Sequence, residues 1–182
     1  PANGAFLLAA NHIDYLDGFF ITFALLSRNQ RKVKFLTETK NYWWTGGAAI
    51  PVNRANKARA LEKAARALSR GSIICIFPEG ARNATNTLLP ARTGIARLAL
   101  WSNVPVIPVG LIGGSGASPM DSIRTYLRRG NGVKVRIGEP ITFPKMERAA
   151  IDKPLLEQTT TTIMHHVAQL SNKFYHHEHS VE

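Results

Sequence analysis

The sequence has too few of the residues on which several protein classes depend. Its 182 residues include a single cysteine, Cys75, which leaves no internal disulfide and no cysteine-rich zinc site. The longest apolar stretch, Gly18 to Leu26, falls well short of the roughly 18 residues that a membrane-spanning helix requires. No basic segment precedes the first apolar residues, as it would in a secretory signal. We therefore expect a reducing environment and, if a membrane is involved, a chain that lies on its surface.

Acidic residues are also scarce, and this imbalance of charge restricts the partners. The chain has 23 Lys and Arg against 12 Asp and Glu, which gives a formal net charge of +11. A field of this sign attracts nucleic acid, anionic lipid or a phosphorylated substrate. A basic nucleic-acid-binding module is the main alternative from another functional class. It is disfavoured because the aromatic residues are not interleaved with basic residues along a strand and no nucleic-acid motif is present.

The remaining composition predicts one globular domain. A hydrophobic content of 45% and this length allow a sizeable core, so we expect a single domain over residues 1–182. The chain begins with Pro1 and runs directly into the apolar stretch "AFLLAANH". We therefore expect that an N-terminal segment is missing from this sequence.

Short apolar runs bounded by turn residues alternate with helical patterns, which predicts an α/β fold with a mixed, largely buried β-sheet flanked by helices. The strands are expected at Ala5–Ala10, Val33–Thr37, Ala49–Val52, Ser72–Phe77, Val104–Val109 and Val133–Ile137. The fifth of these runs lies in "VPVIPVGL". Its two prolines cannot donate to a ladder, so we expect an edge or terminal strand there.

Apolar residues at helical spacing predict the helices. The stretch "NKARALEKAARALSRG" is expected to end at Gly71 and to bury Ala58, Leu61, Ala64, Ala65 and Leu68. A second helix is expected from Thr93 to Ser102. A third should begin at Pro154, which suits a first helical turn, and continue to about Tyr175. Its apolar stripe comprises Leu156, Ile163, Val167, Leu170 and Phe174.

The first candidate site is "NHIDYLDGFF", which lies between a predicted strand and a predicted helix, where α/β folds present functional groups. His12 is the candidate base, because an imidazole titrates near neutral pH and takes a proton from a hydroxyl when a carboxylate orients it. Asp14 and Asp17 are both candidates for that carboxylate. Either aspartate can instead cap the following helix, so spacing alone does not choose between them.

Two further stretches follow predicted strands and carry arginines. In "FPEGARN", Gly80 permits a turn with backbone amides pointing outward, and Arg82 beside them supplies a cation for a phosphate. The stretch "GGAAIPVNR" ends in a second candidate, Arg54. Each stretch can equally be an ordinary strand-to-loop turn with an arginine in water.

Taken together and in this order, these stretches resemble the glycerolipid acyltransferase family. The first matches its N-H-x-x-x-x-D block, and "FPEGAR" matches its F-P-E-G-x-R block. The stretch "GAAIPVNR" is similar to its G-x-I-P-V-x-R block, and "VPVIPV" is similar to its V-P-V-x-P-V block. The blocks run from Asn11 to Val109.

The resemblance implies a glycerol-3-phosphate acyltransferase-like fold and an enzyme of phospholipid biosynthesis. Such an enzyme moves a fatty acyl group from acyl-CoA or acyl-carrier protein to the hydroxyl of 1-acyl-glycerol-3-phosphate and makes phosphatidic acid. The resemblance makes His12 the general base and Asp17 its orienting partner, and leaves Asp14 as a cap or a solvent-facing residue. The expected acceptor-binding set is Arg54, Glu79, Gly80 and Arg82.

Three departures leave another lyso-lipid acceptor open. Ala81 and Asn83 stand where many members have Thr and Ser, so a hydroxyl that can touch substrate is missing. Asn53 stands where an acidic residue commonly precedes the arginine of the second block. These changes affect the acceptor rather than the reaction.

An activated acyl thioester needs a base, donors for the oxyanion and positioning, but no covalent enzyme intermediate. Cys75 lies in the apolar run "IICIF", which favours a buried structural role over a nucleophilic one. A hydrolase using His12 and Asp17 on water is the rival reaction, although no G-x-S-x-G elbow is present. No cofactor and no metal are expected, because the terminal histidines of "HHEHSVE" form no built site.

The positive charge also fits anionic co-substrates and a membrane surface. Acyl-CoA, acyl-carrier protein and anionic lipid are all negative, and "RNQRKVK" supplies a basic segment. In "KNYWWTGG", Trp43 and Trp44 stand near Lys40, which suits a membrane interface as well as a packed core. We expect the chain at the cytoplasmic face of a membrane, peripheral or anchored by the missing segment.

Overall fold

The computed structural model describes residues 4–29, 31, 33–38, 48–52, 57–114, 118, 120–124 and 133–176. These residues form a six-stranded sheet with the order β3-β2-β4-β1-β5-β6. Its strands are β1 (Phe6–Ala10), β2 (Val33–Glu38), β3 (Ala49–Val52), β4 (Ile73–Ile76), β5 (Val106–Ile112) and β6 (Lys134–Ile137). All neighbouring pairs are parallel except β5 with β6, so the predicted mixed sheet is confirmed. Each predicted strand is present, with small shifts at its ends.

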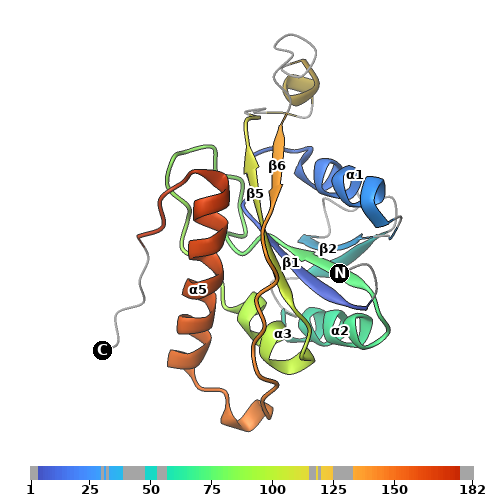
Figure 1. The fold of residues 1–182 in the computed structure, drawn as a ribbon, viewed down its shortest axis with the longest axis vertical. Helices are drawn as coiled ribbons and strands as arrows, with labels where there is room; N and C mark the ends of the chain where they lie inside the picture. The colour runs from blue at the N-terminus through green and yellow to red at the C-terminus, as the bar shows by residue number, and fades with distance from the viewer. Residues whose placement is uncertain are drawn as a thin grey trace.

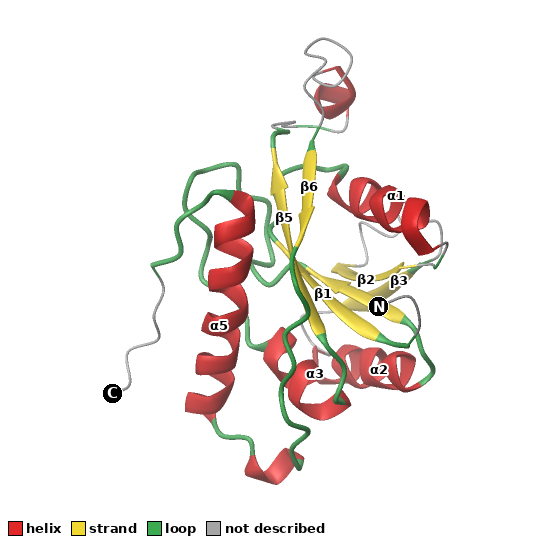
Figure 2. Cartoon of the chain, viewed as in Figure 1, coloured by secondary structure: helices red, strands yellow, loops and turns green. Residues whose placement is uncertain are grey.

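Helices cover both faces of this sheet (Figures 1 and 2). They are α1 (Asp17–Asn29), α2 (Lys57–Ser69), α3 (Gly94–Ser102) and α5 (Lys153–Ser171), with a short 3-10 turn at Arg148–Ala150. The apolar residues of α1 pack on one face, whereas those of α2, α3 and α5 pack on the other. Among the helices of the described residues, none combines the length and the apolar character needed to cross a membrane.

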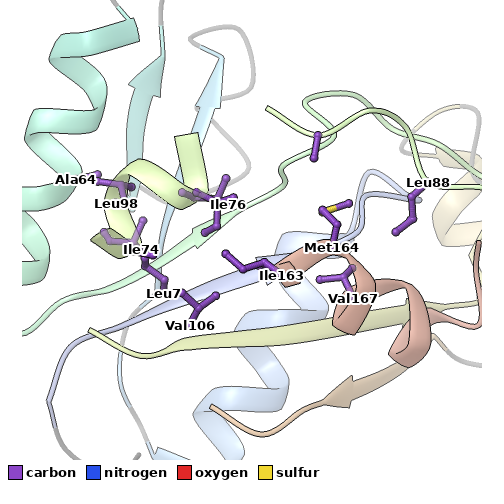
Figure 3. Packing of buried hydrophobic residues seen from close by; sticks show 14 of the residues in the cluster. Leu7, Ala64, Ile74, Ile76, Leu88, Leu98, Val106, Ile163, Met164 and Val167 are labelled. Carbon is purple, nitrogen blue, oxygen red and sulfur yellow. The ribbon is translucent and has the colours of Figure 1, made fainter. Parts of the chain in front are cut away.

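The larger of the two cores lies between the sheet and the face made by α2, α3 and α5. Figure 3 shows Ile163 and Val167 of α5 and Ala64 of α2 with Leu7 of β1 and Ile74 of β4, all within one buried cluster. The odd-numbered Leu7 and Ala9 face this cluster, while the alternate residues Phe6 and Leu8 face α1. Because β1 is buried on both faces, its sequence is a continuous apolar run and not an alternating one.

The prediction that "VPVIPVGL" forms an edge strand is wrong, because β5 lies between β1 and β6. Pro108 has no backbone N–H to donate. The sheet accommodates it because β6 ends at Ile137, one residue before the position opposite Pro108. The Pro108 carbonyl still accepts the N–H of Gly138 at 2.9 Å. A Cβ at Gly138 would lie 3.0 Å from the Pro108 ring, so a glycine here leaves room for the proline. The pairing resumes where Val106 and Ile141 exchange two backbone hydrogen bonds.

The third predicted helix ends earlier than expected. Helix α5 stops at Ser171, and Asn172 takes the left-handed conformation with φ of 55°. Lys173 N then donates to the carbonyl of Ala168, which closes a Schellman-type turn and ends the helix. Phe174 therefore lies beyond the helix and is exposed, whereas Met164 belongs to the buried stripe.

One residue of the first predicted helix also faces the other way. In α2 the buried residues are Ala60, Ala64 and Leu68, while Ala58 is exposed. Leu61 and Ala65 are partly buried against the same core. The chain leaves α2 at Gly71, which has φ of +82° and open space around it, as the predicted helix end requires.

Several sequence features lie outside the described residues. They include Arg54 and Asn53 of the second block, the paired Trp43 and Trp44, and Lys40. The last six residues of the histidine-rich tail and positions 115–117 and 119 of the predicted glycine-rich loop also lie outside them.

Candidate active site

The first and third sequence blocks meet at one edge of the sheet. Strand β1 ends at Ala10 immediately before the His12 segment, and β4 ends at Ile76 immediately before "FPEGARN". The two strands are parallel neighbours, so their carboxyl ends point the same way. This edge is where open α/β sheets bind ligands.

His12 and Asp17 form a direct pair. His12 Nδ1 lies 2.7 Å from Asp17 Oδ2, and the two side chains are 22% and 0% exposed. The pair spans the turn between β1 and the first residue of α1. Spacing alone could not choose between Asp14 and Asp17 as the partner of His12, and the structure pairs His12 with Asp17. The catalytic roles of the two residues stay a prediction.

Asp17 is held by two backbone amides of the preceding turn as well as by the imidazole. The same Oδ2 accepts the N–H groups of Ile13 at 2.6 Å and Asp14 at 2.9 Å. Oδ1 is buried without a hydrogen-bond partner among the described residues. Burial raises the pKa of Asp17 above its ordinary value, and the hydrogen bond and charge of His12 oppose that rise. The aspartate therefore meets its donors in a nearly dry environment.

The ring of His12 is also held by aromatic stacking on one face. Phe77 stacks on it with a centroid separation of 4.3 Å and an interplanar angle of 21°. Phe35 in turn stacks on Phe77 at 6.4 Å. With Nδ1 engaged by Asp17, Nε2 is the ring nitrogen left for a substrate. The first residue of the "FPEGARN" block thus has a role that sequence reasoning missed.

Asp14 does not face solvent, contrary to that part of the expectation. It is buried, and its Oδ1 accepts the N–H of Leu16 at 3.0 Å just before α1 begins. Asn11 is also structural. Its side-chain amide exchanges two hydrogen bonds with the backbone of Leu111, at 3.0 and 2.7 Å, and so ties the end of β1 to β5.

Glu79 and Asn83 hold the backbone of His12 from both sides. Glu79 Oε1 accepts the His12 N–H at 3.0 Å, and the Asn83 N–H donates to the His12 carbonyl at 2.6 Å. Glu79 Oε2 accepts from the Asn83 side chain at 3.1 Å and from Leu89 N at 2.9 Å. The Glu79 side chain is 4% exposed and accepts three hydrogen bonds from the protein. In this structure it positions the backbone of His12.

Asn83 is one of the departures from the family pattern, and its side chain points inward. Its Oδ1 accepts the N–H of Thr85 at 3.0 Å and the Thr85 hydroxyl at 2.7 Å. Its Nδ2 also donates to the Thr87 carbonyl at 2.6 Å. The side-chain amide of Asn83 therefore closes this loop. Ala81, the other departure in this block, is exposed.

Gly80 lies at the tip of the turn and permits a close contact. Its φ is +69°, and its N–H donates to the Phe77 carbonyl at 3.0 Å, so this amide closes the turn and does not point outward as predicted. A Cβ here would lie 2.8 Å from the guanidinium of Arg92. Sequence reasoning missed Arg92, because Arg92 lies outside the four motifs. Only the fold places its guanidinium against the turn at Gly80, twelve residues earlier.

Two exposed arginines therefore flank the turn. The Arg82 guanidinium lies over the Tyr15 ring, 3.4 Å from its centroid. Arg82 and Arg92 take part in none of the ion pairs formed among the described residues. Their positive charge is thus available to an anion beside the His12 and Asp17 pair.

Neither a thiol nor a metal centre accompanies this site in the described residues. Cys75 lies on β4, is fully buried, and burial raises the pKa of its thiol far above the usual range. No group of three or more His, Cys, Asp or Glu side chains in the described ranges is placed to hold a metal ion.

Comparison with known proteins places this geometry in a family. The sequence model of the family described as Acyltransferase matches residues 1–112, which include all four blocks. The chain belongs to the acyltransferase family. The family assignment covers β1 through β5, and so it includes the His12 and Asp17 pair and the "FPEGARN" loop.

Several curated relatives are named 1-acyl-sn-glycerol-3-phosphate acyltransferase. The protein of Cocos nucifera is 31% identical over 105 residues, which cover 56% of this chain and 33% of the relative. The protein of Haemophilus influenzae is 39% identical over 72 residues, covering 37% and 29%. A chloroplastic protein of Brassica napus is 28% identical over 148 residues, covering 76% and 41%. The chain spans less than half the length of these relatives.

Among solved structures, the 1-acyl-sn-glycerophosphate (LPA) acyltransferase PlsC of Thermotoga maritima has the same fold. The TM-score is 0.58 at 21% sequence identity, and the match covers 95% of this chain and 69% of that one. The predicted acyltransferase fold is thereby confirmed.

Proposed function

We propose that this chain is an O-acyltransferase that moves a fatty acyl group from the thioester of acyl-CoA or acyl-carrier protein to the hydroxyl of 1-acyl-glycerol-3-phosphate. The observation that carries the proposal is the contact of His12 Nδ1 with Asp17 Oδ2 at the end of β1, with the His12 backbone held by the "FPEGARN" loop. The name shared by the curated relatives supports the acceptor.

The tautomer of His12 follows from its partner. Asp17 Oδ2 already accepts two backbone N–H groups, so Nδ1 meets it best as a third donor. Nε2 then carries a lone pair and is the base. It takes the proton of the acceptor hydroxyl as the oxygen attacks the thioester carbonyl carbon. The carbon–sulfur bond breaks, and the leaving thiolate takes that proton back from the imidazolium, which restores His12.

No acyl-enzyme intermediate is part of this proposal. The only thiol of the chain, Cys75, is buried in β4 and is held in its protonated form by desolvation. The charge on the imidazolium is opposite to that of Asp17, so the pair stabilises the state in which the hydroxyl has lost its proton.

The phosphate of the acceptor is assigned to the cations at the turn. Arg82 and Arg92 flank Gly80 and are exposed, and the same loop holds the His12 backbone through Glu79. In this proposal a phosphate bound by these guanidiniums positions the neighbouring glycerol hydroxyl for deprotonation by Nε2. Arg54 remains a third candidate from the sequence.

A membrane surface is the proposed location, on the cytoplasmic side. The exposed face of α1 presents Phe19 and Phe23, which are 64% and 66% exposed and stack on each other, and Leu26 continues the stripe. The helix begins at Asp17, so this apolar stripe starts two residues from the catalytic pair. Aromatic side chains and a net charge of +11 both favour an anionic lipid interface.

The test is to supply radiolabelled oleoyl-CoA with a panel of acceptors and identify the labelled product. The panel comprises lysophosphatidate, glycerol-3-phosphate and other lysophospholipids, each in anionic vesicles. Labelled phosphatidic acid that disappears in His12→Ala is the expected result. Label found only in free fatty acid would make the chain a hydrolase, and label in a different phospholipid would replace the acceptor while keeping the reaction.

A further inference from the structure

The segment that follows α5 lies against the active-site loop. Lys173 Nζ donates to the Asn83 carbonyl at 2.8 Å. The Phe174 N–H donates to the Asn86 carbonyl at 2.9 Å, and Leu88 N donates back to the Phe174 carbonyl at 2.8 Å. These three bonds join residues 173–174 to residues 83–88, about 90 positions earlier in the chain. The loop that holds His12 is therefore itself held by the C-terminal segment.

The end of α5 is placed with little freedom. Gly110 of β5 lies against it so closely that a Cβ there would overlap the backbone of Leu170 and Ser171. From β6, Arg136 Nη1 donates to the Leu170 carbonyl at 3.3 Å and to Asn172 Oδ1 at 2.8 Å. The left-handed Asn172 then turns the chain so that the next residue points toward the loop. The position of Lys173 thus follows from the packing of α5 on the sheet.

Lys173 connects to His12 through one residue. The Asn83 carbonyl accepts from Lys173, and the Asn83 N–H donates to the His12 carbonyl at 2.6 Å. The Asn83 side chain also donates to Glu79, whose other oxygen accepts the His12 N–H. A shift of Asn83 would therefore loosen both backbone bonds of the histidine.

Partial burial of the Lys173 ammonium removes water from a charged group, which is unfavourable. Its side chain is partly buried, and that burial lowers the pKa of its ammonium, while the carboxylates of Glu79 and Asp17 oppose the change. A neutral donor would satisfy a single carbonyl without that cost. The cation is therefore best explained by the two carboxylates that surround the histidine, both of which it attracts.

From this chain of contacts we infer that Lys173 is a positioning residue for the general base, acting from the end of α5 through Asn83. It does not touch the reacting atoms. It keeps the loop 83–88 and the carboxylate of Glu79 in register, so that His12 Nε2 stays aimed at the acceptor hydroxyl. Misplacement of a catalytic group by about 1 Å costs up to about a hundredfold in rate. This inference rests on the proposed acyl transfer for its kinetic readout only.

The experiment compares Lys173→Met with Lys173→Arg in the whole chain. The assay uses oleoyl-CoA and lysophosphatidate, and the matched control is Lys63→Met, which changes an exposed lysine on α2. We expect Lys173→Met to lower kcat by about tenfold to a hundredfold with little change in KM. Lys173→Arg should retain most of kcat, since it keeps the charge and the donor. A kcat of Lys173→Met within twofold of wild type, or an equally slow Lys173→Arg, would overturn the inference.

Amide hydrogen exchange tests the same inference without any substrate. The Asn83 N–H, which is bonded to the His12 carbonyl, should lose protection by tenfold or more in Lys173→Met, while Ile74 in β4 stays protected. Unchanged protection at Asn83 would contradict the positioning role. If the methionine variant does not fold, Lys173→Gln is measured in the same way. If wild type transfers no acyl group to any acceptor, the proposed function fails and the exchange result alone decides the role of Lys173.

Discussion

Glu79 Oε1 accepts the backbone N–H of His12 at 3.0 Å, although the two residues are 67 positions apart. The contact exists because β1 and β4 are parallel neighbours whose carboxyl ends deliver both blocks to one place. The acidic residue of one block thus sets the position of the base in the other. The order of the blocks in the sequence does not show this contact. The contact explains why both blocks belong to one site.

This relationship makes Glu79→Gln a sensitive change. Both carboxylate oxygens of Glu79 accept hydrogen bonds, from three donors in all. A glutamine has only one acceptor oxygen, so its NH2 group would face at least one of these donors and leave it unsatisfied. We expect the free energy of unfolding to fall by about 1–3 kcal/mol, the cost of an unsatisfied buried donor, and kcat to fall with it. Urea unfolding and the transfer assay measure the two effects. The control is Glu139→Gln, an exposed residue after β6, and equal results for both variants would refute the role of Glu79.

Removal of the imidazole should separate catalysis from folding. His12→Ala is expected to lower turnover by about a hundredfold to ten-thousandfold, the range for loss of a general base. The two bonds that hold residue 12 to Glu79 and Asn83 use its backbone, so they survive the substitution. Thermal unfolding should therefore stay close to wild type, with a modest loss from the Phe77 stacking. Turnover equal to wild type would exclude His12 as the base.

The Asp17→Asn variant should show a defined dependence on pH. Burial raises the pKa of Asp17 above its ordinary 3.8, so the folded chain holds this proton more tightly than the unfolded chain. The resulting stabilisation is complete below pH 3.8 and is lost as pH rises through the folded pKa. Asparagine has no such loss. The unfolding free energy of the variant minus that of wild type should thus rise with pH and then level off.

Urea unfolding between pH 3 and pH 8 measures that difference, with hydrogen-bond changes appearing as a constant offset. A difference that stays flat or falls with pH would show that burial does not dominate at Asp17. Activity should move the other way. The asparagine amide cannot orient Nδ1–H as the carboxylate does, and we expect turnover to fall by about a hundredfold or more.

The two arginines at the Gly80 turn should affect the acceptor more than the donor. Arg82→Ala and Arg92→Ala are each expected to raise KM for lysophosphatidate by about tenfold to a hundredfold, because a charge-assisted bond to phosphate contributes about 1.5–3 kcal/mol. The matched control is Arg66→Ala, an exposed arginine in the last turn of α2. Initial rates with each substrate varied in turn provide the measurement. An equal rise in KM for oleoyl-CoA would assign these residues to the donor or to general charge.

The buried strands β1 and β4 were predictable because each is a short, continuous apolar run, whereas β6 alternates charged and apolar residues, as a half-exposed edge strand does. The pairing of His12 with Asp17 was not predictable from spacing, since Asp14 offers the same side chain three residues closer in the chain. The family pattern chose Asp17, and the structure shows why the choice is geometric. Asp17 lies at the first turn of α1, where its carboxylate points back to the imidazole and to the two backbone amides of the turn.

What failed from sequence depends on neighbours that are distant in the chain. Pro108 predicts an edge strand locally, but the end of β6 and the small Gly138 make room for it inside the sheet. The burial of Glu79 could not be predicted either, because the His12 segment that contacts it follows another strand, and its contact with the acceptor stays a prediction. Lys173 lies beyond every motif, and only the packing of α5 on β5 brings it to the site.

That packing leads to the last prediction, at Gly110. A Cβ there would overlap the backbone of Leu170 and Ser171, and backbone atoms of a helix cannot move aside as a flexible side chain can. Gly110→Ala should therefore lower the free energy of unfolding by about 1–3 kcal/mol, the usual cost of overpacking. It should also displace Lys173 and reduce kcat. Gly94→Ala in α3 is the control, because its Cβ would meet only Leu61 at an ordinary 3.5 Å. A Gly110→Ala variant as stable as this control would show that α5 is held loosely on β5, and that Lys173 is not positioned by this contact.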